Sequence, residues 1–136
     1  MVKVILGLKG SGKTKQLIDS INSAIKEETG SVVCIEKGNA LTFDVDYRVR
    51  LINASEYDIG SYEFLKGFIS GLHAGNFDIT QIFIDNLYKL AGTNDNDATA
   101  AFLSWCDTFG KVHGMKLTVT VSDDPANLPE SIIKYQ

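Results

Sequence analysis

The stretch GLKGSGKT, residues 7–14, follows directly on an apolar run at the start of the chain. Its spacing is G-x-x-x-x-G-K-[ST], the pattern of a loop whose backbone N–H groups surround phosphate oxygens. Glycines let the backbone come close to a ligand and adopt angles closed to other residues. Lys13 adds a cation and Thr14 a hydroxyl that can ligate Mg²⁺, where a helix begins and its dipole favours an anion. The stretch therefore predicts a site for a nucleoside phosphate.

The flanking residues supply the strand and the helix that such a loop needs. The apolar run over residues 2–6 fits a buried strand, and after Lys13 the apolar residues Leu17, Ile18, Ile21, Ala24 and Ile25 recur at helical spacing. An ordinary surface turn is disfavoured because both flanks are of the right type. We interpret the stretch as a phosphate-binding loop (P-loop, or Walker A motif) with the predicted nucleotide contacts Gly7, Leu8, Lys9, Gly10, Ser11, Gly12, Lys13 and Thr14.

Length, charge and cysteine content narrow the class of protein. The chain has 136 residues, which predicts one nucleotide-binding domain over residues 1–136. A net charge of −4 with only two arginines, Arg48 and Arg50, argues against a large nucleic-acid surface. Cys34 and Cys106 lie in apolar contexts, so buried free thiols in a reducing compartment are favoured over a disulfide. With no secretion signal and no long apolar run, we expect a cytoplasmic protein without a membrane partner.

Strand patterns alternate with helix patterns along the whole chain, which is typical of a parallel sheet covered on both faces. We expect strands at 31–38, near 49–53, at 82–84 and at 115–122, besides the first, and helices after Ser61 and after the acidic cluster near residue 95. The alternation before residue 53 indicates an edge strand. The fold class predicted is α/β with about five mainly parallel strands.

Two local patterns carry expectations of their own. Gly67, Gly71 and Gly75 fall four residues apart in the helix after Ser61, and we expect them to let this helix pack closely on the sheet. Asp95 or Asp97 is expected to cap the helix that follows it, because the cluster lacks the glycine and glutamate of a calcium loop.

Asp85 is the candidate for the second half of the site. It follows the apolar residues Ile82, Phe83 and Ile84, and ligands of open α/β sheets bind beyond the carboxyl ends of strands. A bound Mg²⁺ needs a carboxylate from a neighbouring strand. We therefore predict that Thr14 and Asp85 hold the metal, Asp85 through water.

The order of these motifs resembles the RecA-like P-loop NTPase core of the additional-strand class, with CIEKGNALTFD and IFIDN as the matching strand ends. The resemblance implies a three-layer α/β/α fold. It also implies roles: Lys13 on the β and γ phosphates, Glu36 polarising the attacking water, and Ser122 sensing the γ-phosphate. Many ATPases of this class place a glutamate after the Walker B aspartate, where this chain has Asn86, so Glu36 is the candidate that remains.

Several alternatives stay open. Glu36 is as readily a strand-end acid paired with Lys37 or Lys9. The element order is also similar to the core of type II thymidine kinases, although Asn86 and the two separate cysteines count against it. The chain is similar to short stand-alone P-loop proteins sometimes labelled twitching-motility ATPases, but the domain and arginines of such a motor are not indicated. A non-catalytic nucleotide-binding module is the third alternative.

The function predicted is therefore an ATP-binding protein, a slow Mg²⁺-dependent ATPase that acts as a switch or needs a partner. ATP is favoured only because the N-K-x-D signature of GTPases is absent. No arginine is placed near the phosphates, so Arg48 or Arg50 of a neighbouring copy would have to supply one. Lys9 and Lys15 bracket the loop, either as phosphate contacts or as solvated lysines, and Lys13 is expected to be solvated without ligand. A homo-oligomer or a protein partner is left open.

Overall fold

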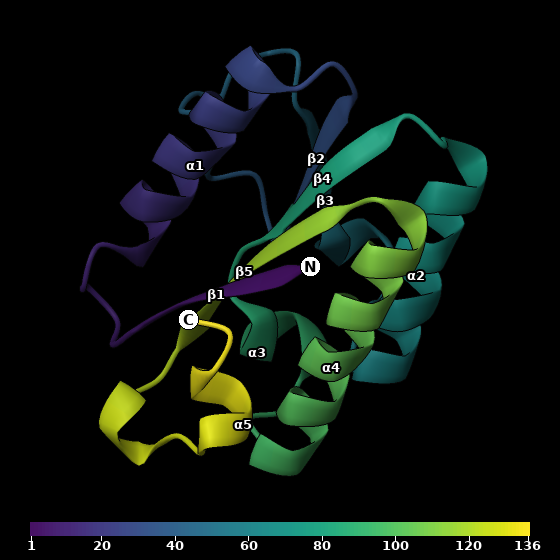
Figure 1. The fold of residues 1–136 in the computed structure, drawn as a ribbon. Helices are drawn as coiled ribbons and strands as arrows, with labels where there is room; N and C mark the ends of the chain where they lie inside the picture. The colour runs from purple at the N-terminus through teal and green to yellow at the C-terminus, as the bar shows by residue number, and fades with distance from the viewer.

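The computed structural model describes all residues, Met1–Gln136, and is built on one parallel sheet (Figure 1). Its five strands are β1 (Val2–Gly7), β2 (Ser31–Glu36), β3 (Arg50–Asn53), β4 (Ile79–Ile84) and β5 (Lys116–Ser122). They lie in the order β1-β5-β4-β2-β3, and every pair is parallel. Because all strands run the same way, their carboxyl ends meet at one edge of the sheet.

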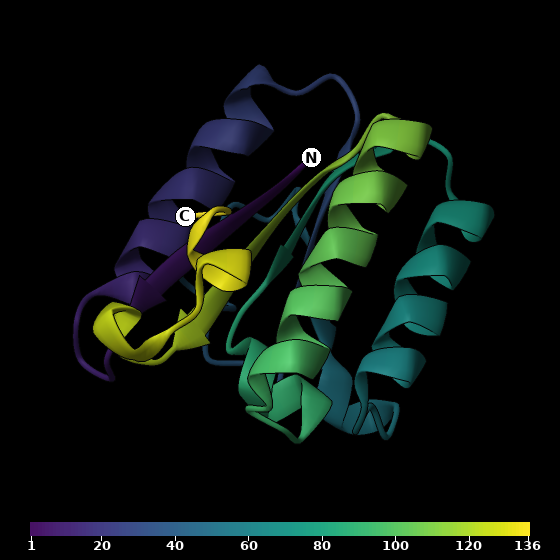
Figure 2. The same cartoon turned by 60° about the horizontal axis from the view of Figure 1, so that its bottom comes forward.

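Helices cover both faces of the sheet. The helix α1 (Lys13–Glu27) lies alone on one face, and α2 (Tyr62–Gly75) and α4 (Asn96–His113) lie side by side on the other (Figures 1 and 2). The short helices α3 (Leu87–Ala91) and α5 (Glu130–Ile133) lie on the side of α4. Short 3₁₀ turns are formed by Ala54–Glu56 and Pro125–Asn127. This is the three-layer α/β/α arrangement predicted from the sequence.

Two apolar cores hold the layers together. The larger contains 24 buried residues between the sheet and the α2–α4 layer, among them Phe102 and Ile84. The smaller contains 11 buried residues between the sheet and α1, including Leu17, Ile21 and Phe83. The residues predicted to form the apolar side of α1 therefore do anchor it, and through it the P-loop, to the sheet.

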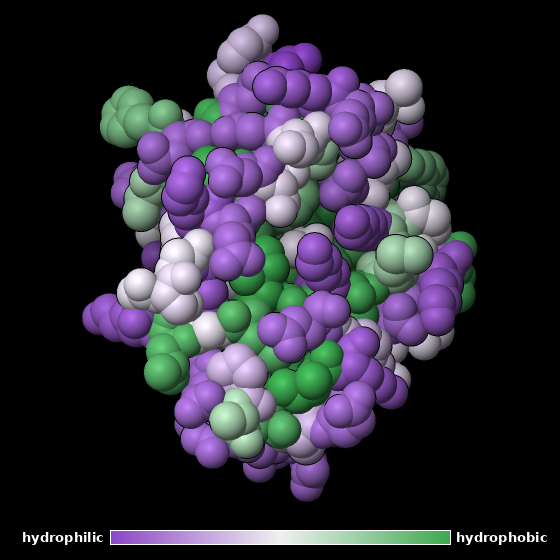
Figure 3. Space-filling view, turned by 60° about the vertical axis from the view of Figure 1, so that its left-hand side comes forward, coloured by the Kyte–Doolittle hydropathy of each residue, from purple (hydrophilic) through white to green (hydrophobic).

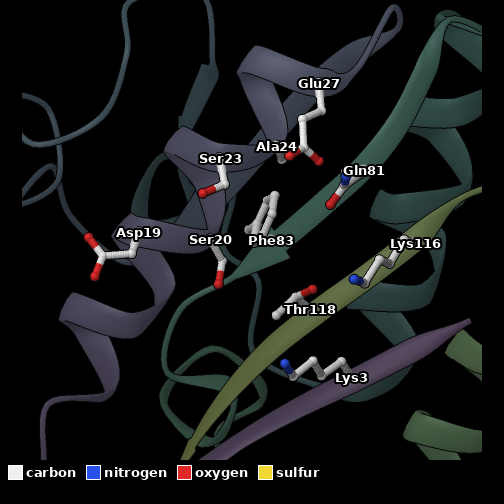
Figure 4. Close-up of a pocket in the computed structure, with 10 residues that line it drawn as sticks. All are labelled: Lys3, Asp19, Ser20, Ser23, Ala24, Glu27, Gln81, Phe83, Lys116 and Thr118. Carbon is white, nitrogen blue, oxygen red and sulfur yellow. The ribbon is translucent and has the colours of Figure 1, made fainter.

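The face under α1 is only partly covered. A groove of about 320 Å³ opens between α1 and strands β4, β5 and β1, and only two of its ten lining residues are hydrophobic. Figure 4 shows Lys3 and Lys116 on either side of Thr118, with Ser20 and Ser23 of α1 across the groove. In Figure 3 the surface over α1 is mostly hydrophilic, and apolar side chains gather below it.

Most predicted elements are confirmed, with small shifts at their ends. β3 is an edge strand as expected, and Asp95 caps α4 by accepting a hydrogen bond from the Ala98 N–H at 2.9 Å. Cys34 and Cys106 are both buried and free. The helix α3 was not predicted, because five residues are too few to show helical periodicity. None of the helices is long and apolar enough to cross a membrane.

The expected role of the α2 glycines is wrong. A Cβ placed on Gly67, Gly71 or Gly75 would meet no atom within 4 Å, so these residues face open space instead of the sheet. The residues of α2 that pack inward are Tyr62, Leu65 and Ile69. The glycines do lie on one face of a helix, as their spacing predicts. That face points outward because Tyr62, Leu65 and Ile69 form the face that is buried.

Candidate nucleotide-binding site

The P-loop connects the carboxyl end of β1 to the first turn of α1. Gly10 and Gly12 have φ of 84° and 89°, in the left-handed region that favours glycine. At Gly7 a Cβ would lie too close to the Ser11 side chain, so Ser11 would have to shift. The loop is closed by a hydrogen bond from the Ser11 N–H to the Leu8 carbonyl at 3.0 Å. The glycines of the motif thus occupy the positions at which the loop needs them.

Lys13 is not solvated, contrary to expectation. The residue is only 7% exposed, and its Nζ donates a hydrogen bond to the carbonyl oxygen of Leu8 at 2.9 Å. The ammonium group folds back over the loop because a neighbouring carbonyl is within its reach. A substitution of Lys13 therefore also removes a contact that stabilises the P-loop without ligand.

A polar cleft lies where the P-loop faces the carboxyl ends of β4 and β5. Its volume is about 400 Å³, and no hydrophobic residue lines it. The lining residues are Lys9, Gly10, Lys13, Thr14, Asp85, Asn86, Lys89, Thr120 and Ser122. The two residues predicted to hold Mg²⁺, Thr14 and Asp85, thus face one cavity although 71 positions separate them (85 − 14).

The carboxylate of Asp85 is held by β5, the strand between β4 and the P-loop strand. Thr120 is 1% exposed, and its hydroxyl donates to Asp85 Oδ1 at 2.7 Å. The Thr120 hydroxyl oxygen in turn accepts the Asn86 N–H at 2.7 Å. The Thr120 hydroxyl has one proton and uses its oxygen to accept the Asn86 N–H, so the proton points toward Asp85. Thr120 therefore orients Asp85 and leaves its second oxygen without a protein partner.

Asn86 redirects the chain after Asp85. Its φ of 60° and ψ of 67° are left-handed, which asparagine tolerates better than most residues. The turn starts α3, which brings Lys89 to the cleft. Tyr88 on the same helix donates to Asp123 Oδ2 at 3.0 Å, and burial raises the pKa of its phenol. These contacts fasten α3 to the end of β5.

Ser122 lies beside the start of the P-loop. It pairs in register with Gly7, and the Asp123 N–H donates to the Gly7 carbonyl at 3.1 Å. Ser122 also lines the cleft at the carboxyl end of β5. Its role toward a γ-phosphate stays a prediction.

Three lysines and no arginine surround the cleft. Lys9, Lys13 and Lys89 line it, whereas Lys15 extends toward Asp19 at 3.8 Å with both side chains exposed. Lys9 is therefore placed where it could contact a phosphate, whereas Lys15 is a solvated lysine outside the cleft. The arginines are remote, because Arg48 precedes β3 and Arg50 begins it, at the opposite edge of the sheet from the P-loop.

Glu36 ends β2 but does not line the cleft. It is 5% exposed, and its two carboxylate oxygens accept the N–H groups of Ala40 at 3.1 Å and Leu41 at 3.2 Å. It forms no ion pair with Lys37 or Lys9. Burial raises the pKa of Glu36, partly offset by these two hydrogen bonds, and the nearby Asp85 carboxylate adds to the rise. The structure thus gives Glu36 a structural task, and its predicted task toward water stays untested.

The cleft fits a phosphate group with a magnesium ion by the chemistry of its donors. Thr14 and Asp85 offer the hydroxyl and carboxylate oxygens that Mg²⁺ prefers, and lysines and P-loop N–H groups favour anionic oxygens. No cluster of three or more histidine, cysteine or acidic residues could hold a metal by itself. Any Mg²⁺ here would therefore depend on phosphate oxygens and water.

Sequence reasoning missed Thr120 and Lys89. Thr118, Thr120 and Ser122 alternate along β5 with Val119 and Val121, so a polar face of this strand was visible in the sequence. The position of Lys89 could not be predicted, because it depends on the left-handed turn at Asn86 and on a five-residue helix.

Comparison with solved structures identifies the fold. The chain is similar to the crystal structure of the flagellar accessory protein FlaH from Methanocaldococcus jannaschii, with a TM-score of 0.60 and 16% sequence identity. The match covers 98% of this chain and 65% of the FlaH chain, so this chain spans less than two thirds of the length of that chain. The fold is RecA-like. No family model matches the sequence, and no curated protein matches it.

Proposed function

We propose that the protein binds ATP with Mg²⁺ in the cleft at the carboxyl edge of the sheet. One observation carries the proposal: the P-loop, the Thr14 hydroxyl and the Asp85 carboxylate face the same polar cavity. The position of β5 between the P-loop strand and the Asp85 strand agrees with an additional-strand arrangement. A RecA-like fold is compatible with this use of the cleft.

The chain's own residues divide the work of binding. Backbone N–H groups of the P-loop and the dipole of α1 favour the phosphates, and Lys13 exchanges its bond to the Leu8 carbonyl for phosphate oxygens. Thr14 and the free oxygen of Asp85 hold Mg²⁺, which neutralises phosphate charge when bound. Thr120 keeps the Asp85 carboxylate turned toward the cleft, and Lys9 and Lys89 add positive charge at its rim.

We propose that hydrolysis is slow and that the protein acts as a switch or depends on a partner. An arginine finger contributes ~10³ to 10⁵ in turnover in comparable enzymes, and neither arginine of this chain is near the P-loop. Glu36 is the candidate for orienting water, but it would first have to release the Ala40 and Leu41 N–H groups.

A non-catalytic nucleotide-binding module is the second candidate. It is favoured by the same hydrogen bonds, which leave the Glu36 carboxylate fully occupied within the protein. Turnover measured on purified protein separates this module from a slow ATPase.

Thermal unfolding with and without MgATP tests the binding proposal. Ligand at 100 times its dissociation constant should stabilise the wild type by about 2.7 kcal/mol. Lys13→Met keeps most of the buried aliphatic chain and removes the ammonium, so it should lose most of this gain. Lys15→Met is the matched control, and it should keep the gain because Lys15 does not line the cleft. An equal stabilisation of the Lys13→Met protein by MgATP would refute the assignment.

A further inference from the structure

The helix α2 has two apolar faces, and the second is only partly covered, because its Phe68 packs against the larger core and lies 5.5 Å from the Tyr57 ring. Tyr62, Leu65 and Ile69 are buried against the rest of the protein. A second face is formed by residues spaced three and four apart, which lie on one side of a helix. We call it the α2 stripe, and it consists of Phe64, Gly67, Phe68, Gly71 and Gly75. Figure 2 shows α2 at the margin of the helical layer, with α4 on one side and no helix on the other.

The α2 stripe borders the largest apolar groove of the molecule. This groove has a volume of about 590 Å³, and seven of its thirteen lining residues are hydrophobic. Phe68, Gly71 and Gly75 line it from α2, and Ile52 and Val33 line it from the sheet. Phe64 is 47% exposed beside a shallower hollow that continues along Gly67. A groove with a mainly hydrophobic lining next to an exposed phenylalanine is a candidate contact surface.

The glycines of the stripe do nothing within the chain. A Cβ on any of them would meet no atom within 4 Å, and none has a positive φ. Glycine is a poor helix former, so three glycines on one exposed face weaken α2 without improving its packing. Their effect is a notch that another helix can enter.

We propose that the α2 stripe pairs with the α2 stripe of a second copy of this chain in an antiparallel, two-fold dimer. The stripe is complementary to itself in this orientation. One register places Phe64 opposite Gly75 of the second copy and Phe68 opposite its Gly71. Each ring then faces a notch, and the two-fold axis crosses the stripe between Phe68 and Gly71.

The charges at the two ends of the stripe agree with this orientation. The Glu63 side chain lies at the amino end of α2, where it is 83% exposed and pairs with Lys66 of the same helix at 3.0 Å. Arg50 lines the groove at the other end, is exposed and forms no ion pair, whereas Arg48 is held by Asp46 at 3.0 Å. Antiparallel pairing brings Glu63 of each copy toward Arg50 of the other. A parallel pair would bring like ends together.

The proposed dimer is independent of nucleotide binding. A contact of this symmetry is closed with two copies, so it does not extend into a filament. Arg50 lies at the amino end of β3, away from the carboxyl edge where the P-loop lies. The dimer therefore leaves both clefts open and does not supply an arginine to either.

Sedimentation velocity over a concentration series tests the dimer. We expect a monomer–dimer equilibrium in the wild type. Gly71→Ala with Gly75→Ala should raise the dimer dissociation constant at least ~10-fold, because methyl groups fill the notches. The same variant should raise the melting temperature at dilutions where the wild type is monomeric, because alanine favours the helix. This opposite response separates a lost interface from a damaged fold.

Two further sets of variants define the interface. Phe43→Ser is the control for surface hydrophobicity, since Phe43 is 98% exposed on another loop, and it should leave the dissociation constant unchanged. Glu63→Arg and Arg50→Glu should each weaken the dimer, and the double variant should restore it. A wild type that stays monomeric throughout the series overturns the proposal. A dimer that the alanine variant does not weaken overturns it as well, as does a double variant without rescue.

Discussion

The cleft at the carboxyl edge of the sheet and the groove beside α2 differ in the polarity of the residues that line them. No hydrophobic residue lines the cleft, and three lysines face one acidic residue across it. Seven of the thirteen residues that line the groove are hydrophobic, and Arg48 and Arg50 line it as well. A polar cleft with convergent donors fits a small, charged ligand, whereas an apolar groove on a helix fits a protein surface. We therefore propose different partners for these two regions of the protein.

Glu36→Gln is expected to have the largest effect on the chemistry of the cleft. If Glu36 orients the attacking water, turnover should fall ~10² to 10⁴-fold at matched ATP occupancy. Turnover of the wild type should rise with pH as Glu36 ionises, above the usual range of a glutamate because burial raises its pKa. Equal hydrolysis by both proteins retires Glu36, and tight binding without hydrolysis in either supports the non-catalytic module.

The same variant has an effect on stability with a defined sign. The pKa of Glu36 is higher in the folded protein than in the unfolded chain, so ionisation opposes folding. The stability that Glu36 contributes is fully present below its pKa in the unfolded chain. It is lost as the pH rises through its pKa in the folded protein. Urea unfolding of wild type and Glu36→Gln across this range should show a pH-dependent loss in the wild type that the variant lacks.

Thr120→Val should have a smaller effect on metal binding. Valine keeps the shape of threonine but removes the donor to Asp85 and the acceptor of the Asn86 N–H. Loss of a group that orients a metal ligand costs ~10 to 100-fold in metal affinity, and a buried unpaired N–H costs about 1–3 kcal/mol of stability. Thr120→Ser retains the hydroxyl and serves as the control in Mg²⁺ titrations with ATP present. A valine variant with wild-type Mg²⁺ affinity would show that Asp85 does not need Thr120.

The smallest expected effects separate the lysines and the two regions. Lys9→Ala should weaken ATP binding a few-fold, on the order of 1 kcal/mol for an exposed charge, whereas Lys15→Ala should change it less. Phe68→Ser should leave ATP affinity unchanged, because the α2 stripe does not touch the cleft. Calorimetric titration measures all three. A large loss of ATP affinity in Phe68→Ser would show that the two regions are coupled.

The parts of this protein that sequence predicts are those with strong local patterns. The P-loop carries its own signature over eight residues, GLKGSGKT, and Asp85 stands at the end of an apolar strand. The alternation of strands and helices was enough for a parallel sheet with β3 at its edge. Cross-strand contacts are different, because the bond from Thr120 to Asp85 depends on β5 lying beside β4.

The errors have physical causes as well. Lys13 was expected in solvent because its charge is most easily placed there, but the Leu8 carbonyl lies within its reach. The glycines of α2 were expected against the sheet because small residues permit close packing. The sequence could not show that Tyr62, Leu65 and Ile69 take the inner face, since Phe64 and Phe68 are equally apolar.

Calorimetric titration of ATP with and without Mg²⁺, on wild type and Asp85→Asn, tests whether the cleft binds ATP with Mg²⁺. Mg²⁺ should strengthen ATP binding in the wild type. In Asp85→Asn most of that gain should be lost, several kcal/mol or more than ~100-fold in affinity, because the charged metal ligand is gone. ATP binding without Mg²⁺ should persist in the variant, since the P-loop is intact. A wild type that binds no ATP, or an equal gain from Mg²⁺ in both proteins, would contradict the proposed site.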